Sequence, residues 1–334
     1  MAVFRALQLG DMLCAVPALR ALRKGVPHAR ITLIGLPWAA DFAKRFSRYV
    51  DGFLAFPGYP GFPEREFDPH TFPPFLLEAQ QQGFDAAIQM HGNGHYSNAV
   101  VKLLGASTDA GFCAAGDPCP DPSHFIRYPE YGHEINRLLR LTDFLGFPAC
   151  GTHLEFPLDL RDYAAAALVP GVAALEPGAY ACLHPGSRAT DKRWAPDRFA
   201  AVGDFLAHRG LRVVITGSAQ ERELAQAVAD AMQEPALNTA SDVSVGGLAA
   251  ILSGARVMVS NCTGVSHIAA ALRVPSVIVF SASDPSRWAP LDAQRHRALY
   301  YPGQAPVAAV LDQVDQVLAA FKPTPAPVGT PVWL

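Results

Sequence analysis

Residues 257–272 read Val257-Met258-Val259-Ser260-Asn261-Cys262-Thr263-Gly264-Val265-Ser266-His267-Ile268-Ala269-Ala270-Ala271-Leu272. A β-branched apolar run ends at Ser260-Asn261, and an Ala-rich helical pattern follows Thr263-Gly264, so the order predicts a strand, a tight turn and a helix. Thr263 is placed to cap the helix, and His267 follows one turn later on the same face. The unpaired N–H groups at the start of such a helix favour an anion such as phosphate. An ordinary capped turn with a satisfied histidine is the alternative.

The same alternation of strands and helices extends over the whole chain. The first βαβ unit combines strand-like runs at Ala2–Leu9 and Arg30–Gly35 with a helical pattern over Asp11–Lys24. The pattern restarts in the second half with a strand at Tyr180–Leu183 and a helix at Pro196–Arg209. Strands that alternate with helices predict an α/β protein with parallel sheets covered on both faces.

The chain of 334 residues is too long for one typical core and fits two domains. A stretch bracketed by prolines and glycines, from Phe156 to Gly178, marks the boundary. We therefore predict two Rossmann-like domains with doubly wound parallel sheets, residues 1–165 and 166–334, which face each other across a cleft. The Pro-rich tail, residues 322–334, is expected to be extended.

Composition narrows the class of protein. A net charge of −3 gives no electrostatic footprint for nucleic acid, so we expect no nucleic-acid partner. The six cysteines show neither a C-x-x-C pair nor metal-ligand spacing, which predicts reduced thiols. Since the sequence has no Asp-x-Asp motif and no His/Cys cluster, we expect no metal site, and we expect no cofactor. The chain has no signal-like N-terminus and no run of about 18 apolar residues, so we expect a cytoplasmic protein.

An unusual segment lies between Phe53 and Phe75, where seven aromatic residues alternate with six prolines. One interpretation is a proline-stiffened loop that packs on its own rings. The other is a surface for an amphiphilic ligand or the membrane. The sequence does not decide between them.

Candidate anion-binding residues recur at strand ends in the second half. The turn at Gly186-Ser187 offers backbone N–H groups, and Lys192 offers a point charge for a phosphate, although it could equally be a solvated lysine. Glu221 opens a helix, where a carboxylate could hold a ribose diol or stabilise the helix dipole.

The first half contributes two further candidate segments. Gly10 and Asp11 lie between a strand and a helix, where Asp11 is either a functional carboxylate or an N-cap. His91, Asn93 and His95 follow a later strand and could line the same cleft. The G-x-S-x-G, H-E-x-x-H and P-loop patterns are missing, which disfavours hydrolase, zinc protease and NTPase functions.

The motifs occur in the order Leu9-Gly10-Asp11, His184-Pro185-Gly186-Ser187, Lys192-Arg193-Trp194, Thr216-Gly217-Ser218 with Glu221, Ser260-Asn261 with Thr263-Gly264 and His267, and Asp284-Pro285. Taken together they resemble the ADP-heptose:lipopolysaccharide heptosyltransferase family, glycosyltransferase family 9. The resemblance implies a GT-B fold, a donor site in the C-terminal domain and an acceptor site in the N-terminal domain. It also implies an inverting, metal-independent transfer.

The resemblance assigns roles to individual residues. It places the general base on Asp11 and the ribose contact on Glu221. It places the phosphate and nucleotide contacts on Ser187, Lys192, Thr263, Gly264 and His267, and the Gly186-Ser187 turn adds Gly186 as a further donor-side candidate. Their position after strands of the first half, and not the resemblance, makes Gly10, His91, Asn93 and His95 the acceptor-side candidates.

Cys262 departs from the family pattern, which usually has an aspartate before Thr-Gly. The sequence therefore predicts a glycosyltransferase without fixing its donor sugar. ADP-heptose is one candidate donor, and a lipopolysaccharide-core-like or other glycan or glycolipid is the expected acceptor, with peripheral contact to the inner face of the cytoplasmic membrane left open. A GT-B nucleotide-sugar epimerase and a non-catalytic nucleotide-sugar binding module are the alternatives.

Overall fold

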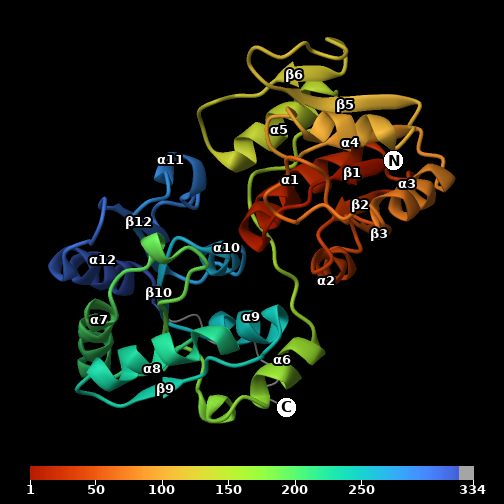
Figure 1. The fold of residues 1–334 in the computed structure, drawn as a ribbon. Helices are drawn as coiled ribbons and strands as arrows, with labels where there is room; N and C mark the ends of the chain where they lie inside the picture. The colour runs from red at the N-terminus through yellow and green to blue at the C-terminus, as the bar shows by residue number, and fades with distance from the viewer. Residues whose placement is uncertain (323–334) are drawn as a thin grey trace. The chain divides into compact units, whose positions relative to one another are not determined.

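The computed structural model describes residues 1–322, and the chain divides into two compact units, Met1–His153 and Leu154–Leu334 (Figure 1). The predicted boundary at residues 165 and 166 is wrong, because it lies inside helix α6 (Leu160–Ala167). This helix belongs to the second unit, where it packs against α9 (Val245–Ser253). Of the tail predicted to be extended, residues 323–334 lie outside the described part of the chain.

The first unit is a six-stranded parallel sheet with helices, in the strand order β3-β2-β1-β4-β5-β6. Its elements are β1 (Ala2–Phe4), α1 (Leu9–Gly25), β2 (Thr32–Gly35), α2 (Ala39–Arg45), β3 (Gly52–Ala55), α3 (Phe72–Gln81), β4 (Ala86–Gln89), α4 (Ser97–Leu103), β5 (Thr108–Cys113), β6 (Phe125–Arg127) and α5 (Glu134–Phe144). The central strand β1 pairs with β2 on one side and β4 on the other, so the strand order reverses between β1 and β4.

The second unit repeats this architecture in the strand order β12-β11-β10-β7-β8-β9. After α6 it contains η1 (Val172–Ala174), β7 (Tyr180–His184), η2 (Thr190–Lys192), α7 (Pro196–His208), β8 (Arg212–Ile215), η3 (Ala219–Glu221), α8 (Arg222–Ala231), β9 (Ala236–Asn238), α9, β10 (Val257–Asn261), α10 (Gly264–Ala271), β11 (Ser276–Phe280), α11 (Pro285–Trp288), β12 (His296–Tyr300) and α12 (Val307–Ala320). The order reverses between β7 and β10, which pair with each other. Two doubly wound parallel sheets are thus confirmed.

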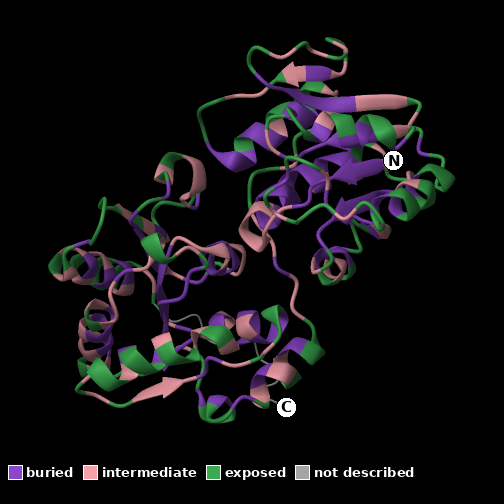
Figure 2. Cartoon of the chain, in the orientation of Figure 1, coloured by how far each residue is buried: buried purple, intermediate pink, exposed green. Residues whose placement is uncertain are grey.

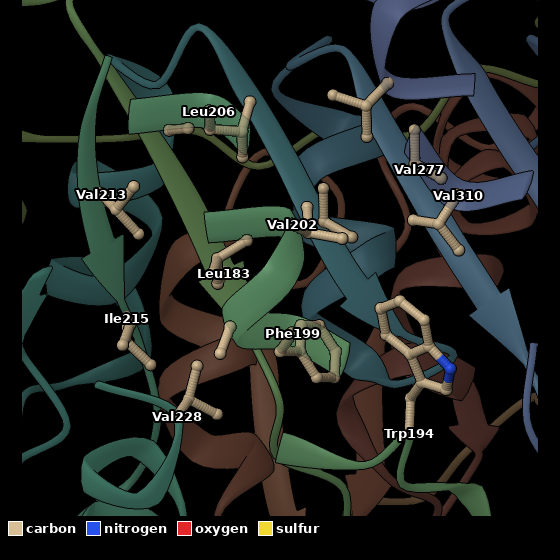
Figure 3. Close-up of a cluster of buried hydrophobic side chains, with 14 of the residues drawn as sticks. Leu183, Trp194, Phe199, Val202, Leu206, Val213, Ile215, Val228, Val277 and Val310 are labelled. Carbon is tan, nitrogen blue, oxygen red and sulfur yellow. The ribbon is translucent and has the colours of Figure 1, made fainter. Parts of the chain in front are cut away.

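Each core consists of apolar strand residues covered by one face of the helices. The central strands, such as β1 and β10, are buried throughout, whereas the outer faces of the helices are exposed (Figure 2). In the second unit Leu206 and Phe199 of α7 pack with Val213 of β8 and the ring of Trp194 (Figure 3). The apolar runs that predicted strands are therefore the runs that the helices remove from water.

Two strands, β6 and β12, were not predicted. Both lie at the edge of their sheet and both carry charged residues, Arg127 in β6 and Arg297 in β12. An edge strand has one partner and needs no continuous apolar run, so periodicity detects it poorly.

The aromatic segment is mostly part of the first core. Its ends belong to β3 and α3, and the rings of Phe56, Phe62, Phe72 and Phe75 are buried. The centroid of the Phe56 ring lies 5.0 Å from that of Phe4 and 5.1 Å from that of Phe62. These contacts support the interpretation of a loop that packs on its own rings.

The prediction that all six cysteines are reduced thiols is wrong for two of them. Cys113 and Cys119 form a disulfide, and their Cα atoms lie 5.5 Å apart, within the usual range for such bonds. The turn that follows β5 brings Cys113 and Cys119 together. The spacing of the two cysteines in the sequence does not reveal this turn. The remaining cysteines, Cys14, Cys150, Cys182 and Cys262, are not part of this disulfide.

Candidate functional site

In the second unit the predicted site residues gather where the strand order reverses. Ser260 of β10 pairs with His184 of β7, so the segments that follow these two strands leave the sheet side by side. One segment carries Gly186 and Ser187, and the other carries Thr263 and Gly264. Ligands of doubly wound sheets bind outside the carboxyl ends of the strands at this position.

The start of α10 has the geometry that the sequence predicts. Thr263 is the N-cap, and its hydroxyl oxygen accepts a hydrogen bond from the N–H of Val265 at 3.3 Å. His267 lies one turn further along and is only 4% exposed, with its ring centroid 6.3 Å from that of Trp288. The capped turn is therefore confirmed, and its other N–H groups keep the orientation that suits an anion.

Asn261 ties the two segments together, a role that sequence reasoning missed. Its amide nitrogen donates to the carbonyl of Pro185 at 2.7 Å, and its amide oxygen accepts from the backbone N–H of Trp194 at 2.9 Å. The indole N–H of Trp194 in turn donates to the carbonyl of Ala305 at 2.9 Å. Asn261 is fully buried, so its bonds fix the path between β7 and α7. An asparagine at the end of an apolar strand was the sequence feature that could have revealed this role.

Gly186 and Glu221 are in direct contact. A Cβ atom added at Gly186 would lie 2.3 Å from Oε1 of Glu221, so only glycine fits beside this carboxylate. Oε2 of Glu221 accepts from the N–H of Ser218 at 2.9 Å and from its hydroxyl at 3.0 Å. This capping box confirms the helix-opening role of Glu221 and leaves Oε1 against the Gly186 backbone.

His184, the last residue of β7, is held as a neutral imidazole. The hydroxyl of Thr216 donates to the carbonyl of Leu183 at 3.2 Å and lies 3.0 Å from Nδ1 of His184, so Nδ1 carries the proton and donates to this hydroxyl. Burial lowers the pKa of His184, and the Glu221 carboxylate opposes that shift. The neutral ring leaves Nε2 as an acceptor.

Lys192 and Cys262 are close enough to interact electrostatically. Burial raises the pKa of the Cys262 thiol to about 11, while a hydrogen bond with Ser283 and the charge of Lys192 act in the opposite direction. The residue directly before Thr263 is therefore uncharged at neutral pH, and Lys192 brings a positive charge to its vicinity. Ser187 is 5% exposed, and its carbonyl accepts from Nε of Arg193 at 2.8 Å.

In the first unit Asp11 also lies beside the point where the strand order reverses, in the connection that follows β1. The N-cap of α1 is Gln8, which makes no side-chain capping bond, and Gly10 and Asp11 belong to the first helical turn. The N-cap interpretation of Asp11 is therefore wrong. The carboxylate is half-buried and sits where a negative charge is favoured by the helix dipole.

Arg5 connects Asp11 with two other segments, and sequence reasoning missed it. Its Nε donates to the main-chain carbonyl of Asp11 at 3.1 Å, and its Nη2 donates to Oε1 of Glu134 at 3.0 Å. Its Nη1 donates to the carbonyl of Met90, the residue after β4. The side chain is 1% exposed. An arginine inside the strand-like run Ala2–Leu9 was the signal that could have revealed it.

His91 accepts a hydrogen bond through Nδ1 in this arrangement. The N–H of Ala6 donates to Nδ1 of His91 at 3.2 Å, and burial together with the charge of Arg5 lowers the pKa of the ring to about 3. The neutral ring therefore carries its proton on Nε2, which lies 3.7 Å from Oε2 of Glu64. With Nδ1 already engaged, His91 is poorly suited to act as a general base.

Asn93 and His95 form a separate part of the same connection. The Asn93 side chain accepts from the N–H of His95 at 3.1 Å, as in an Asx-turn. Nδ1 of His95 lies 2.6 Å from Oδ2 of Asp117 in the segment between β5 and β6. The structure thus groups His91 with Arg5 and Asp11, and His95 with Asp117.

Within residues 1–322, no group of three or more His, Cys, Asp or Glu side chains is arranged to hold a metal ion. No helix in this range has the length and apolarity that a membrane span requires.

Comparison with known proteins identifies the family. The model of glycosyltransferase family 9 (heptosyltransferase) matches residues 77–307. Lipopolysaccharide heptosyltransferase 1 of Escherichia coli K12 is 26% identical over 63% of this chain and 65% of its own length. The enzyme of the same name from Pseudomonas aeruginosa PAO1 is 34% identical over 56% of this chain and 51% of its own. The chain thus aligns with less than two-thirds of each curated relative.

Solved structures show the same fold over nearly the full chain. A glycosyl transferase family 9 structure from Veillonella parvula has a TM-score of 0.81 at 19% identity and covers 96% of this chain and 97% of its own. The structure of E. coli heptosyltransferase WaaC with ADP has a TM-score of 0.71 at 20% identity and covers 95% of this chain and 99% of its own. The predicted GT-B fold is therefore confirmed.

The bonds of Asn261 yield a prediction for stability. Asn261→Leu keeps the approximate volume but leaves the Trp194 N–H and the Pro185 carbonyl without their partner. Each orphaned buried group costs about 1–3 kcal/mol, so urea unfolding should show a loss of about 2–6 kcal/mol in the free energy of unfolding. Asn136→Leu, on the exposed surface of α5, is the control and should change it by less than about 0.5 kcal/mol. Equal stability of the two variants would contradict the assigned role.

Proposed function

The chain belongs to glycosyltransferase family 9, the heptosyltransferases, and on that premise we propose that it transfers a sugar from a nucleotide-diphosphate donor to a hydroxyl of a glycan or glycolipid acceptor. We assign the donor to the second unit and the acceptor to the first. The observation that carries this proposal is the convergence of the candidate residues at the point of strand reversal in each sheet.

The donor assignment follows from the charges and donors at the carboxyl ends of β7 and β10. The N–H groups at the start of α10, capped by Thr263, suit the diphosphate. Lys192 adds positive charge, and His267 lies on the first turns of the same helix. Oε1 of Glu221 is directed along the Gly186 backbone, where a ribose diol would find an acceptor. Ser187 adds a polar group to the same turn.

The proposed reaction is an inverting displacement at the anomeric carbon. The Asp11 carboxylate accepts the proton of the acceptor hydroxyl while the hydroxyl oxygen forms the new glycosidic bond. The bond between the anomeric carbon and the diphosphate oxygen breaks with its electron pair, so the nucleoside diphosphate leaves as an anion. Lys192 and the start of α10 stabilise this developing charge.

The sugar and the acceptor belong to the same proposal. The E. coli and P. aeruginosa relatives are named lipopolysaccharide heptosyltransferases, and one similar structure contains ADP. We therefore take ADP-heptose as the first donor to test and a lipopolysaccharide-core glycan as the first acceptor, which would place the enzyme at the inner face of the cytoplasmic membrane. Gly10, His91, Asn93 and His95 are the proposed acceptor-side residues. Because Cys262 is uncharged, a panel of other nucleotide-sugars should be tested as donors beside ADP-heptose.

The base assignment is tested by Asp11→Asn. The substitution keeps the size of the side chain but removes the proton acceptor, so kcat should fall by at least about 100-fold. Donor affinity, measured by calorimetry, should stay within a factor of about three. Asp41→Asn, at the corresponding first turn of α2 and exposed, is the control and should retain parental kcat. Parental activity in Asp11→Asn would move the base elsewhere.

The donor assignment is tested by Lys192→Ala and His267→Ala. Loss of a hydrogen bond to a charged phosphate should weaken ADP binding by about 10- to 100-fold in calorimetry. Lys322→Ala and His208→Ala remove exposed residues of the same types from the second unit and serve as controls. Unchanged ADP affinity in both test variants would refute the phosphate site.

The charges of Lys192 and α10 also bear on the need for a metal. Since both can neutralise the leaving diphosphate, we propose that transfer requires no divalent cation. Turnover measured in excess EDTA should equal turnover without it. Activity that disappears with the chelator and returns with Mg²⁺ or Mn²⁺ would show instead that a metal carries part of this charge.

A further inference from the structure

We propose that Arg5 is the positioning residue for Asp11: by binding the main chain of the first turn of α1, it holds the carboxylate in the orientation needed to take a proton from the acceptor. The inference rests on the proposed function of Asp11. It adds a residue that itself touches neither donor nor acceptor.

The start of α1 is not anchored by its N-cap side chain. The N-cap Gln8 makes no side-chain capping bond to α1. Instead, Nε of Arg5 donates to the carbonyl of Asp11 at 3.1 Å. This bond reaches the backbone of the residue that carries the proposed base.

The rigid guanidinium of Arg5 joins three segments of the first unit. The guanidinium also donates to the carbonyl of Met90, which follows β4, and to Glu134 at the start of α5. The N–H of the next residue, Ala6, holds Nδ1 of His91 at 3.2 Å. Asp11 and His91 are therefore held relative to each other by two consecutive residues of the chain. A planar fork can make such divergent bonds at fixed angles, whereas the ammonium of lysine cannot make them all.

The ion pair of Arg5 and Glu134 is buried. Arg5 and Glu134 are 1% and 3% exposed, and Oε2 of Glu134 also lies 3.4 Å from Nη1 of Arg137. A buried ion pair gives little stability beyond that of apolar side chains of the same volume, because desolvation offsets the attraction. Stability alone therefore does not account for an arginine here. The orientation of the segments that meet at its guanidinium accounts for the arginine.

The test is a double-mutant cycle on kcat with Arg5→Lys and Asp11→Asn. In the parent, Arg5→Lys should lower kcat by up to about 100-fold through misplacement of Asp11, with ADP affinity unchanged. In the Asp11→Asn background the same substitution should change kcat by less than about threefold, because the group that it positions is already absent. An equal loss in both backgrounds, or full activity of Arg5→Lys, would overturn the proposal.

Arg137→Lys is the matched control for a general effect of weakening the buried network. Arg137 bonds to Glu134, the carbonyl of Glu130 and the Tyr128 hydroxyl, with no bond to the Asp11 segment. It should lower the melting temperature as Arg5→Lys does and leave kcat near the parental value. A loss of kcat that tracks melting temperature across both variants would overturn the proposal. If Arg5→Lys does not fold, Glu134→Gln, which weakens the hold on Arg5, replaces it in the cycle.

Hydrogen exchange separates a failure of this inference from a failure of the proposed function. The N–H of Met12 donates to the carbonyl of Gln8 at 2.9 Å and reports on the first turn of α1. Arg5→Lys should accelerate its exchange, and Arg137→Lys should not. If the parent transfers no sugar, the proposed function fails, and this measurement decides the role of Arg5 alone. Unchanged exchange of the Met12 amide would refute it.

Discussion

A parallel sheet whose strand order reverses near its centre leaves a crevice at the carboxyl ends of the two middle strands, because the connections on either side lead away from each other. This constraint acts twice in the chain, between β1 and β4 and between β7 and β10. The segments that follow these four strands carry most of the residues to which we assign roles. Apolar strands buried under helices provide the rigid frame from which the polar segments emerge.

A crevice becomes a defined site only when the segments around it are held in place. Each unit does this with a buried polar side chain at the end of a central strand. Asn261 ends β10 and binds the segment after β7, and Arg5 follows β1 and binds the segments after β1 and β4. In both cases the side chain bonds to main-chain groups of these segments, and Arg5 also bonds to the carboxylate of Glu134.

Much of this could be predicted from the sequence. The β-branched runs and helical periods identified both sheets, and the Thr263-Gly264 turn predicted the cap at α10. The edge strands β6 and β12 were not predicted, because a strand that pairs on one side only needs no continuous apolar run. The domain boundary was predicted too late in the chain, because α6, although near the linker, packs against α9 of the second unit.

The misses within the sites have a common cause. The start of α1 and the disulfide of Cys113 both depend on where the chain turns. Local sequence carries the residue types but not these distances. The role of Arg5 follows from bonds to Asp11, Met90 and Glu134, the last of which is separated from it by 129 positions.

The central claim, sugar transfer from a nucleotide-diphosphate donor, is tested most directly by ADP release from ADP-heptose with and without a lipopolysaccharide-core glycan. We predict that ADP accumulates only when the glycan is present and that one heptose appears on the glycan for each ADP released. Conversion of the donor without acceptor would indicate an epimerase. Calorimetric binding of ADP-heptose and the other nucleotide-sugars of the panel, with no turnover of any of them, would indicate a binding module. Either result would contradict the assignment of this chain as a glycosyltransferase.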